Sequence, residues 1–215
     1  MAPLPLPLRN RLAELILEAF EPGEARATVL ALAQVSEPSG ATVDAADASR
    51  LLALGWFESL PGGRVQLRGA HRAHGPGLSA RASRAASVVR DWRDRHGESL
   101  AALLDRTEAL ANQGLFFEVH ELLEPVWFRA PEPERTALQG LIQVAVAFHH
   151  LENDNREGAR SLLTLGVAKL AEAGAALPLA MRGWLDALRA TLASLTRGQD
   201  PLPAPRWPAP APPTS

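Results

Sequence analysis

Apolar residues recur at helical spacing over most of the chain, and this periodicity predicts its elements. The first set lies three or four positions apart and consists of Leu8, Leu12, Leu15, Ile16 and Ala19. It predicts a helix over residues 9–20. A second helix is expected around residues 29–33. A third would begin at Thr42 or Asp44, whose side chains can cap a helix, and would stop at Gly55.

The pattern then changes from helical spacing to alternation. Val65 and Leu67 alternate with polar neighbours, and a glycine pair separates two short runs. Residues 56–60 and 64–68 are therefore predicted to form a β-hairpin. Three helices followed by a hairpin is the order of a winged-helix domain. We expect residues 1–70 to be a small helical domain with one hairpin, in an order that fits a winged helix.

Residues 71–97 are expected to be a linker and a basic helix. Gly, Pro and small residues follow one another over 69–80, and the helix is predicted near 81–95. Between 64 and 95, two aspartates accompany many arginines, which are Arg64, Arg68, Arg72, Arg81, Arg84, Arg90, Arg93 and Arg95. A solvated connecting helix is the favoured interpretation. The alternative is a surface that contacts nucleic acid through 64–95.

The third helix would be the DNA reader of a winged-helix domain. It opens with Asp44 and Asp47 and offers one basic residue, Arg50. Phosphate contact needs positive charge at that place. DNA binding and a protein-contact or purely structural role therefore both stay open for this part of the chain.

From Ser99 to about Arg197 the pattern is helical again. The interruptions fall at 112–114, 131–133 and 153–155. Short turns between successive helices favour antiparallel neighbours, so residues 98–197 are predicted to form an antiparallel helical bundle. The protein is therefore expected to be mainly α. Residues 198–215 are rich in proline and are expected to be disordered or polyproline-like. Trp207 is interpreted as a stray aromatic, with a docking residue as the alternative.

Composition narrows the possible functions. The chain has 215 residues, of which 47% are hydrophobic, and its formal net charge is -2. It contains no cysteine, which excludes disulfides, thiolate nucleophiles and cysteine metal ligands. No apolar run approaches the roughly 18–20 residues of a membrane span, and the first residues lack the pattern of a signal peptide. We expect a soluble cytoplasmic protein without a membrane partner.

Polar residues are concentrated on two of the predicted bundle helices. His120 and Glu124 are four positions apart and share a face, which Glu121 borders and Trp127 extends. On the later helix, Gln139, Gln143 and His150 also share a face, whereas His149 lies roughly 100° around the helix from His150. If the two helices pack antiparallel, the side chains of His120, Glu124, Gln143 and His150 could converge.

Three interpretations compete for this cluster. His120, Glu124 and His150 could bind a divalent metal ion and leave positions open for water or substrate. A His–Glu pair could instead do acid–base work without a metal, with Gln143 orienting a ligand. The third interpretation is a buried hydrogen-bond network that fixes the register of the helices, and it has about the same weight as the other two together.

These residues also carry a resemblance to a known family. The chain reads N-x-G-x-F-F-E-x-H-E-x-L-E-P-x-W, then L-Q-G-L-I-Q-x-A-x-A-x-x-H, then x-N-x-x-G-A. Over about residues 99–170 this is similar to the bacterial and archaeal family named domain of unknown function 309. Its hallmark, H-x-x-x-E-x-x-W and a distant His, corresponds to His120, Glu124, Trp127 and His150. The family usually has Arg-Gly-Asn where this chain has Asn153-Asp154-Asn155.

The resemblance implies a compact all-α bundle and no particular reaction. The leading hypothesis is a binding or adaptor protein, because no activated nucleophile is visible. Its pocket would be lined by His120, Glu121, Glu124, Trp127, Gln139, Gln143 and His150. One alternative is a metal-dependent hydrolase that uses the three metal-ligand candidates. The other is a DNA-associated regulator that acts through the N-terminal module.

Overall fold

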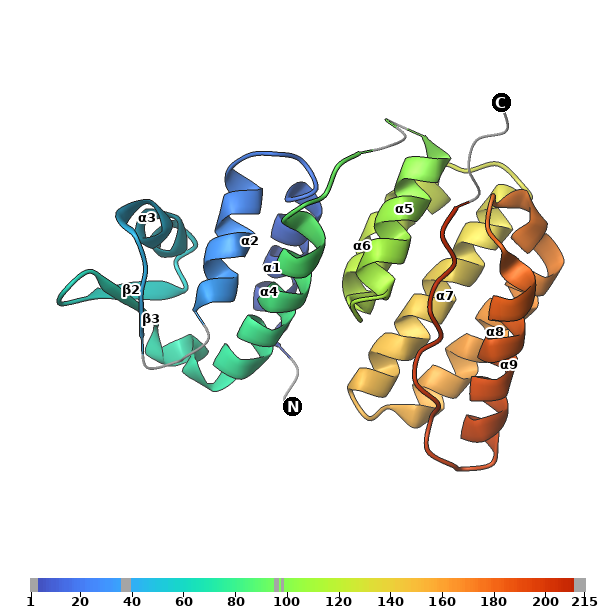
Figure 1. Ribbon diagram of the computed structural model, residues 1–215. Coiled ribbons are helices and arrows are strands. Elements are labelled where there is room, and N and C mark those ends of the chain that lie inside the picture. Colours follow the sequence, from blue (N-terminus) through green and yellow to red (C-terminus); the bar gives the residue numbers. More distant parts are fainter. Residues whose placement is uncertain (1–3, 36–39, 95–96, 98, 211–215) are drawn as a thin grey trace. The chain divides into compact units, whose positions relative to one another are not determined.

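The protein is mainly helical and forms two compact units. The computed structural model describes residues 4–35, 40–94, 97 and 99–210. Unit 1 is Met1–Arg93 and unit 2 is Asp94–Ser215. Helices make up most of the described chain, and the strands form one small antiparallel sheet in unit 1 (Figure 1). The predicted fold class, mainly α with a small hairpin, is therefore confirmed. None of the helices in the described ranges is long and apolar enough to cross a membrane.

Unit 1 combines helices with a small sheet. Its elements in order are α1 (Leu6–Glu18), α2 (Glu24–Gln34), β1 (Ala41–Thr42), α3 (Ala45–Ala53), β2 (Phe57–Leu60), β3 (Arg64–Leu67), the 3-10 helix η1 (Gly69–His74) and α4 (Gly75–Val89). Helix α2 packs against α1, α3 and α4. The side chain of Asp44 accepts a hydrogen bond from the backbone N–H of Asp47, so Asp44 is the cap of α3 as predicted.

The sheet of unit 1 contains the predicted hairpin and one further strand. Strands β2 and β3 pair antiparallel around Gly62 and Gly63, which have φ of 79° and 73°. Such positive φ favours glycine. Strand β1 pairs with the other edge of β3, giving the order β1-β3-β2. The sequence did not reveal β1, because a strand of two residues carries no periodicity.

Helix α4 begins inside the segment that was predicted to be a linker. Pro76 lies in its first turn, where a missing N–H costs nothing. The run of Gly and Pro therefore marks the start of a helix. The helix ends at Val89 rather than near residue 95. Its inner face is built from small and apolar residues, and Arg81 is also buried there.

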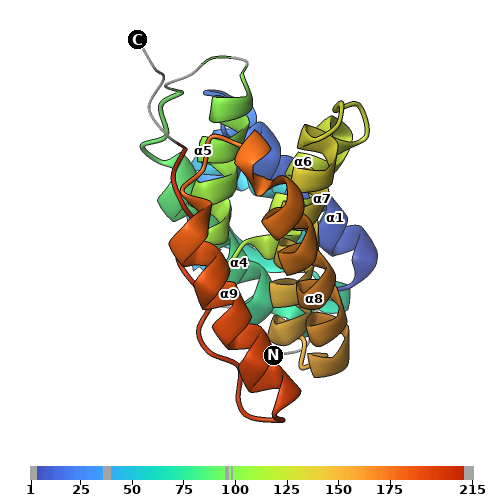
Figure 2. The same cartoon turned by 90° about the vertical axis from the view of Figure 1, so that its right-hand side faces the viewer.

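Unit 2 is a bundle of helices joined by short turns. Its elements are α5 (Leu100–Ala111), α6 (Phe116–Trp127), α7 (Glu134–Glu152), α8 (Arg156–Ala173), the 3-10 helix η2 (Gly174–Ala176) and α9 (Met181–Thr196). Helix α7 packs against α6 and α8, α5 packs against α6, and α9 packs against α8. Figure 2 shows α8 and α9 side by side. Helix α6 continues through Pro125.

Two glycines bring α7 and α8 close together. A Cβ atom on Gly166 of α8 would lie 3.0 Å from the carbonyl oxygen of Gly140 and 3.1 Å from the backbone nitrogen of Val144. A Cβ atom on Gly140 would lie 2.7 Å from Cγ of Leu170. The helix backbones therefore approach as closely as they do because neither position carries a side chain.

Residues 199–210, here named the C-terminal strap, have defined contacts with the bundle. The strap has no helix and runs back along unit 2 after α9 (Figure 1). Trp207 is 2% exposed, and its ring centroid lies 4.8 Å from that of Trp184. The structure thus differs from the expectation of a disordered tail with a stray tryptophan, because the ring of Trp207 is buried against Trp184 of the bundle. Residues 211–215 of that predicted tail lie outside the described part of the chain.

Candidate functional site

The polar residues of α6 contact one another along their own helix. The Nδ1 atom of His120 lies 3.1 Å from a carboxylate oxygen of Glu121, and its Nε2 atom lies 3.8 Å from one of Glu124. The His120 side chain is 26% exposed and that of Glu124 is 54% exposed. The i,i+4 spacing in the sequence thus does place these two side chains on one accessible face of α6.

Aromatic residues extend this face at the end of α6. Trp127 is half-buried, and the guanidinium carbon of Arg135 lies 5.6 Å from its ring centroid. This distance is within the range of a cation–π contact. The next residue, Phe128, is 71% exposed. The corner between α6 and α7 therefore presents one aromatic ring held by an arginine and one ring open to solvent.

On α7, His149 rather than His150 lies near the polar residues of α6. The buried ring of Phe117 is 6.2 Å from the ring of His120 and 5.7 Å from the ring of His149, measured between centroids. Nδ1 of His149 lies 3.6 Å from a carboxylate oxygen of Glu152. The rotation of roughly 100° between two adjacent histidines therefore decides which one faces α6. His149 has this place, whereas the sequence pattern favoured His150.

His150 is instead part of the turn between α7 and α8. Its Nδ1 atom accepts a hydrogen bond of 2.9 Å from the side-chain amide of Asn155. The amide oxygen of Asn155 in turn accepts one of 2.9 Å from the backbone N–H of Gly158, which caps α8. Burial lowers the pKa of His150 below its ordinary value, and the neighbouring charge of His149 lowers it further. A neutral imidazole is the form that can accept from Asn155.

Gly158 is fitted to this turn. A Cβ atom on Gly158 would lie 2.7 Å from the amide nitrogen of Asn155 and 3.0 Å from its amide oxygen. The cap and the hydrogen bond to His150 thus require a residue without a side chain at position 158. His150, Asn155 and Gly158 form a unit that we name the α7–α8 lock.

The remaining predicted pocket residues on α7 are half-buried. Gln139 and Gln143 lie one turn apart, and the amide oxygen of Gln143 is buried without a hydrogen-bond partner. His120 and Glu124 are together on α6, whereas His150 is engaged in the α7–α8 lock. Within residues 4–35, 40–94, 97 and 99–210, no group of three or more His, Cys, Asp or Glu is placed to hold a metal ion. The metal site of His120, Glu124 and His150 is thus not assembled.

The sequence analysis did not single out one buried acid of α6, Glu118. Glu118 is 0% exposed and lies in α6 between Phe117 and Val119, which are also buried. A charged residue inside an apolar run was the available signal. Helical spacing does not group Glu118 with His120, because two positions along a helix correspond to roughly 200° and place the two side chains on opposite sides of α6. Glu118 therefore belongs to the interior of the bundle.

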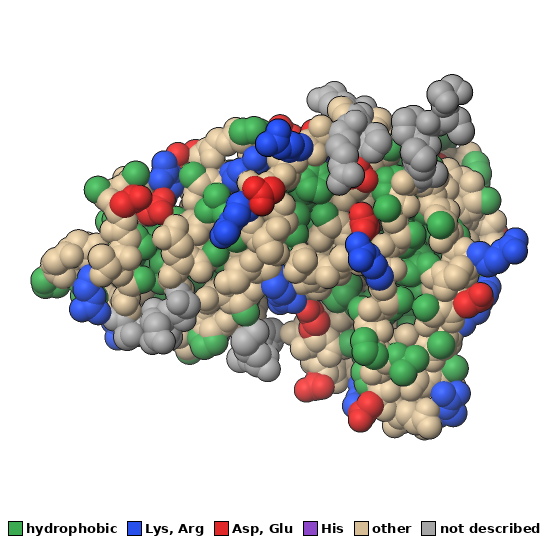
Figure 3. Space-filling view, viewed as in Figure 1, with side chains coloured by type: hydrophobic (Ala, Val, Ile, Leu, Met, Phe, Trp, Pro, Cys, Tyr) green, Lys and Arg blue, Asp and Glu red, His purple; other side chains and the backbone are tan. Residues whose placement is uncertain are grey.

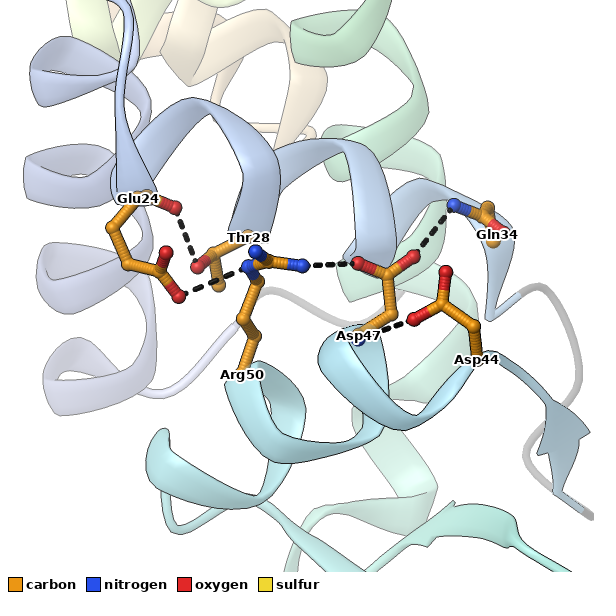
Figure 4. Close-up of polar contacts among 6 residues, drawn as sticks. All are labelled: Glu24, Thr28, Gln34, Asp44, Asp47 and Arg50. Atoms are coloured by element: carbon orange, nitrogen blue, oxygen red, sulfur yellow. Dashed lines mark hydrogen bonds and ion pairs between the residues drawn. The ribbon is translucent and has the colours of Figure 1, made fainter.

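Helix α3 would be the DNA reader of a winged-helix domain, and acidic side chains surround its basic residue, Arg50. Arg50 lies between Asp47 and Glu24, with hydrogen bonds of 2.8 Å and 2.9 Å (Figure 4). The hydrogen bond that Arg50 donates to Asp47 is the main cause that raises the pKa of Arg50. Gln34 donates to the second oxygen of Asp47 at 3.2 Å. The one basic residue of α3 is thus paired with acids of its own unit.

Two of the arginines between 64 and 95 have hydrogen-bond partners within unit 1, and Arg95 lies outside the described residues. Arg68 donates to the carbonyl of Phe57, and Arg72 donates to the carbonyl of Leu67 and to Glu58. On the face drawn in Figure 3, basic side chains are scattered among acidic and apolar ones. The contacts of Arg68 and Arg72 stabilise the hairpin and η1, which gives these two arginines a structural role within unit 1.

The helices that carry the candidate site match a known family. Residues 104–162 match the family model described as domain of unknown function (DUF309). This segment belongs to the DUF309 family. The DUF309 segment contains the polar residues of α6 and α7 as well as the α7–α8 lock, whereas unit 1 and the C-terminal strap lie outside it. Neither the curated proteins nor the solved structures include a match to the chain.

Proposed function

We propose that the DUF309 segment is a binding module that acts as an adaptor by contacting a partner protein through α6 and the adjoining side of α7. The surface in question, the α6–α7 face, comprises His120, Glu121, Glu124, Trp127, Phe128 and His149. One observation carries the proposal. An aromatic corner with Phe128 71% exposed adjoins a row of half-exposed polar residues.

The composition of the α6–α7 face favours a protein partner. Aromatic residues and arginine are enriched at protein interfaces, and a few such residues supply most of the binding free energy. Polar side chains around them form the rim that sets orientation. Trp127 is held in place by Arg135, so less conformational freedom would be lost on binding. Phe128 would then insert into the partner.

The same contacts give less support to a metal-dependent hydrolase. Both ring nitrogens of His120 face carboxylate oxygens of α6, at 3.1 Å and 3.8 Å. Nδ1 of His150 accepts from Asn155 in the α7–α8 lock. The two histidines of the supposed ligand set therefore have different partners and belong to different helices, His120 to α6 and His150 to α7. The DNA-associated role likewise has little support, because Arg50 is paired with Asp47 and Glu24.

A photo-crosslinking experiment tests the proposal. Phe128 is replaced by p-benzoylphenylalanine, which keeps an aromatic ring at the position, and cells that produce the full chain are irradiated. The control places the same group at Leu165, which is 48% exposed on α8. We expect a discrete crosslinked product from position 128 that weakens when Glu124→Ala is added. Equal products from both positions, or none from position 128, would contradict the proposal.

A further inference from the structure

The C-terminal strap is attached to the bundle by one buried side chain, by backbone contacts at both of its ends and by exposed ion pairs. Trp207 is 2% exposed, whereas the side chains of the Arg156–Asp200 pair are 49% and 93% exposed. The Arg206–Glu108 pair spans 3.8 Å, and the Arg206 side chain is 86% exposed. Exposed ion pairs contribute little to stability. The tryptophan therefore provides most of the free energy that holds the strap.

The anchor has a specific seat on the bundle. The ring of Trp207 packs on Trp184 of α9, and the backbone N–H of Trp207 donates a hydrogen bond of 2.8 Å to the side-chain oxygen of Asn112. Asn112 follows the last residue of α5 and is held by a second hydrogen bond, from its amide to Glu108 at 3.0 Å. The seat thus recognises both an indole ring and the backbone that carries it.

The strap is not packed tightly beside this anchor. A hollow of about 470 Å³ lies between the turn that follows α5 and the strap. Its walls include Gly114 and Phe116 on the bundle side and Pro205 and Arg206 on the strap side. A core element would be close-packed along its length. Within residues 201–210 only Trp207 is buried, and it lies next to unfilled space, an arrangement that is typical of a bound peptide.

We propose that the groove between the C-terminal end of α5 and α9 is a recognition site for a Pro-Arg-Trp-Pro peptide, which residues 205–208 occupy as an intramolecular ligand. Proline-rich segments suit such recognition because their extended conformation is largely formed before binding. The seat built from Asn112 and Trp184 accepts the tryptophan and its N–H. Because the ligand is a separable segment, the same sequence supplied as a free peptide competes for the groove.

The test uses the full chain and a fluorescent peptide with the sequence of residues 199–210. In wild type the attached strap competes with the peptide, so the apparent affinity is reduced by the fraction of chains whose groove is open. Full-length Trp207→Ala loses its own anchor. We expect this variant to bind the peptide on the order of tenfold more tightly than wild type does, measured by fluorescence polarisation. A peptide with alanine in place of its tryptophan is the matched control and should not bind.

A second variant covers the case in which Trp207→Ala unfolds the bundle, which circular dichroism would reveal. Asn112→Ala keeps the tryptophan and removes one hydrogen bond to the strap. We expect trypsin to cut Asn112→Ala after Arg206 several-fold faster than wild type while the helices of unit 2 stay intact. The proposal is overturned if the folded Trp207→Ala chain does not bind the peptide. It is equally overturned if the strap in Asn112→Ala becomes cleavable only when the whole bundle unfolds.

Discussion

The close approach of α7 and α8 makes a sharp prediction for Gly166→Ala. The added Cβ atom would lie 3.0 Å from the carbonyl oxygen of Gly140, 3.0 Å from Cγ2 of Val144 and 3.1 Å from the backbone nitrogen of Val144. Two of these three atoms belong to the backbone of α7 and cannot rotate away. The two helices must therefore separate by several tenths of an ångström, which loosens the contacts along their whole interface.

The magnitude follows from two opposing effects. Overpacking a close-packed interior costs about 1–3 kcal/mol. Replacing glycine by alanine inside a helix contributes about 1 kcal/mol in the other direction. Because backbone atoms form the obstacle, the cost should lie in the upper part of its range. We expect Gly166→Ala to lower the free energy of unfolding by about 1–2 kcal/mol.

Gly183→Ala is the matched control on the same bundle. Gly183 lies in α9, and a Cβ atom there would meet nothing within 4 Å. The same chemical change should therefore raise the free energy of unfolding, by up to about 1 kcal/mol. The two substitutions differ in their surroundings and not in their chemistry.

Urea unfolding of the full chain measures both effects. The two units can unfold separately, so the far-ultraviolet circular dichroism is fitted with two transitions and combined with tryptophan fluorescence. With an m-value of about 2 kcal/mol/M, the bundle midpoint of Gly166→Ala should fall by about 0.5–1 M. A midpoint equal to or above that of wild type would refute the reasoning from close backbone approach. So would an equal loss in Gly183→Ala.

Three further outcomes follow from the site. Asn155→Ala should destabilise the bundle by about 1 kcal/mol in the same urea assay, because α8 loses its side-chain cap, and an unchanged midpoint would mean that the cap contributes nothing. The pKa of His150 is lowered from 6.5, so the unfolded state takes up a proton first as the pH falls through that value, and stability declines toward acid. His150→Gln should flatten this decline between about pH 7 and pH 5, and an identical slope would exclude His150 as its source. Calorimetric titration with Zn²⁺ should show no saturable binding that depends on His120, so wild type and His120→Ala should give the same heats. A stoichiometric site that is present in wild type and lost in His120→Ala would favour the metal interpretation.

Local sequence signals were sufficient to predict those features of the structure that depend on a few neighbouring residues. Asp44 is a capping residue before an apolar period, and it caps α3. The glycines at 62 and 63 adopt the positive φ that a tight turn needs. His120 and Glu124 share a face because helical spacing puts them there. Each of these inferences required knowledge of only a few neighbouring residues.

Where the structure differs from an expectation, distant parts of the chain decide the outcome. Trp207 is held by Asn112, which lies 95 positions earlier, so nothing near Trp207 could indicate that it is buried. Helical periodicity gives the angle between His149 and His150 but does not say which side of α7 meets α6. The run of Gly and Pro before α4 has the composition of a linker and also of a helix start, and only packing distinguishes them.

The α7–α8 lock also constrains how this turn can change by mutation. Because a Cβ atom at Gly158 would lie 2.7 Å from the amide of Asn155, a larger residue at 158 is tolerated only after the cap has been replaced or rotated away. Replacing Asn155 alone leaves Nδ1 of His150 without its donor. A substitution at Gly158 therefore displaces the Asn155 amide and breaks the cap, so the glycine is needed only while the asparagine caps α8. Chains that keep the asparagine should keep the glycine, and the two positions should vary as a pair.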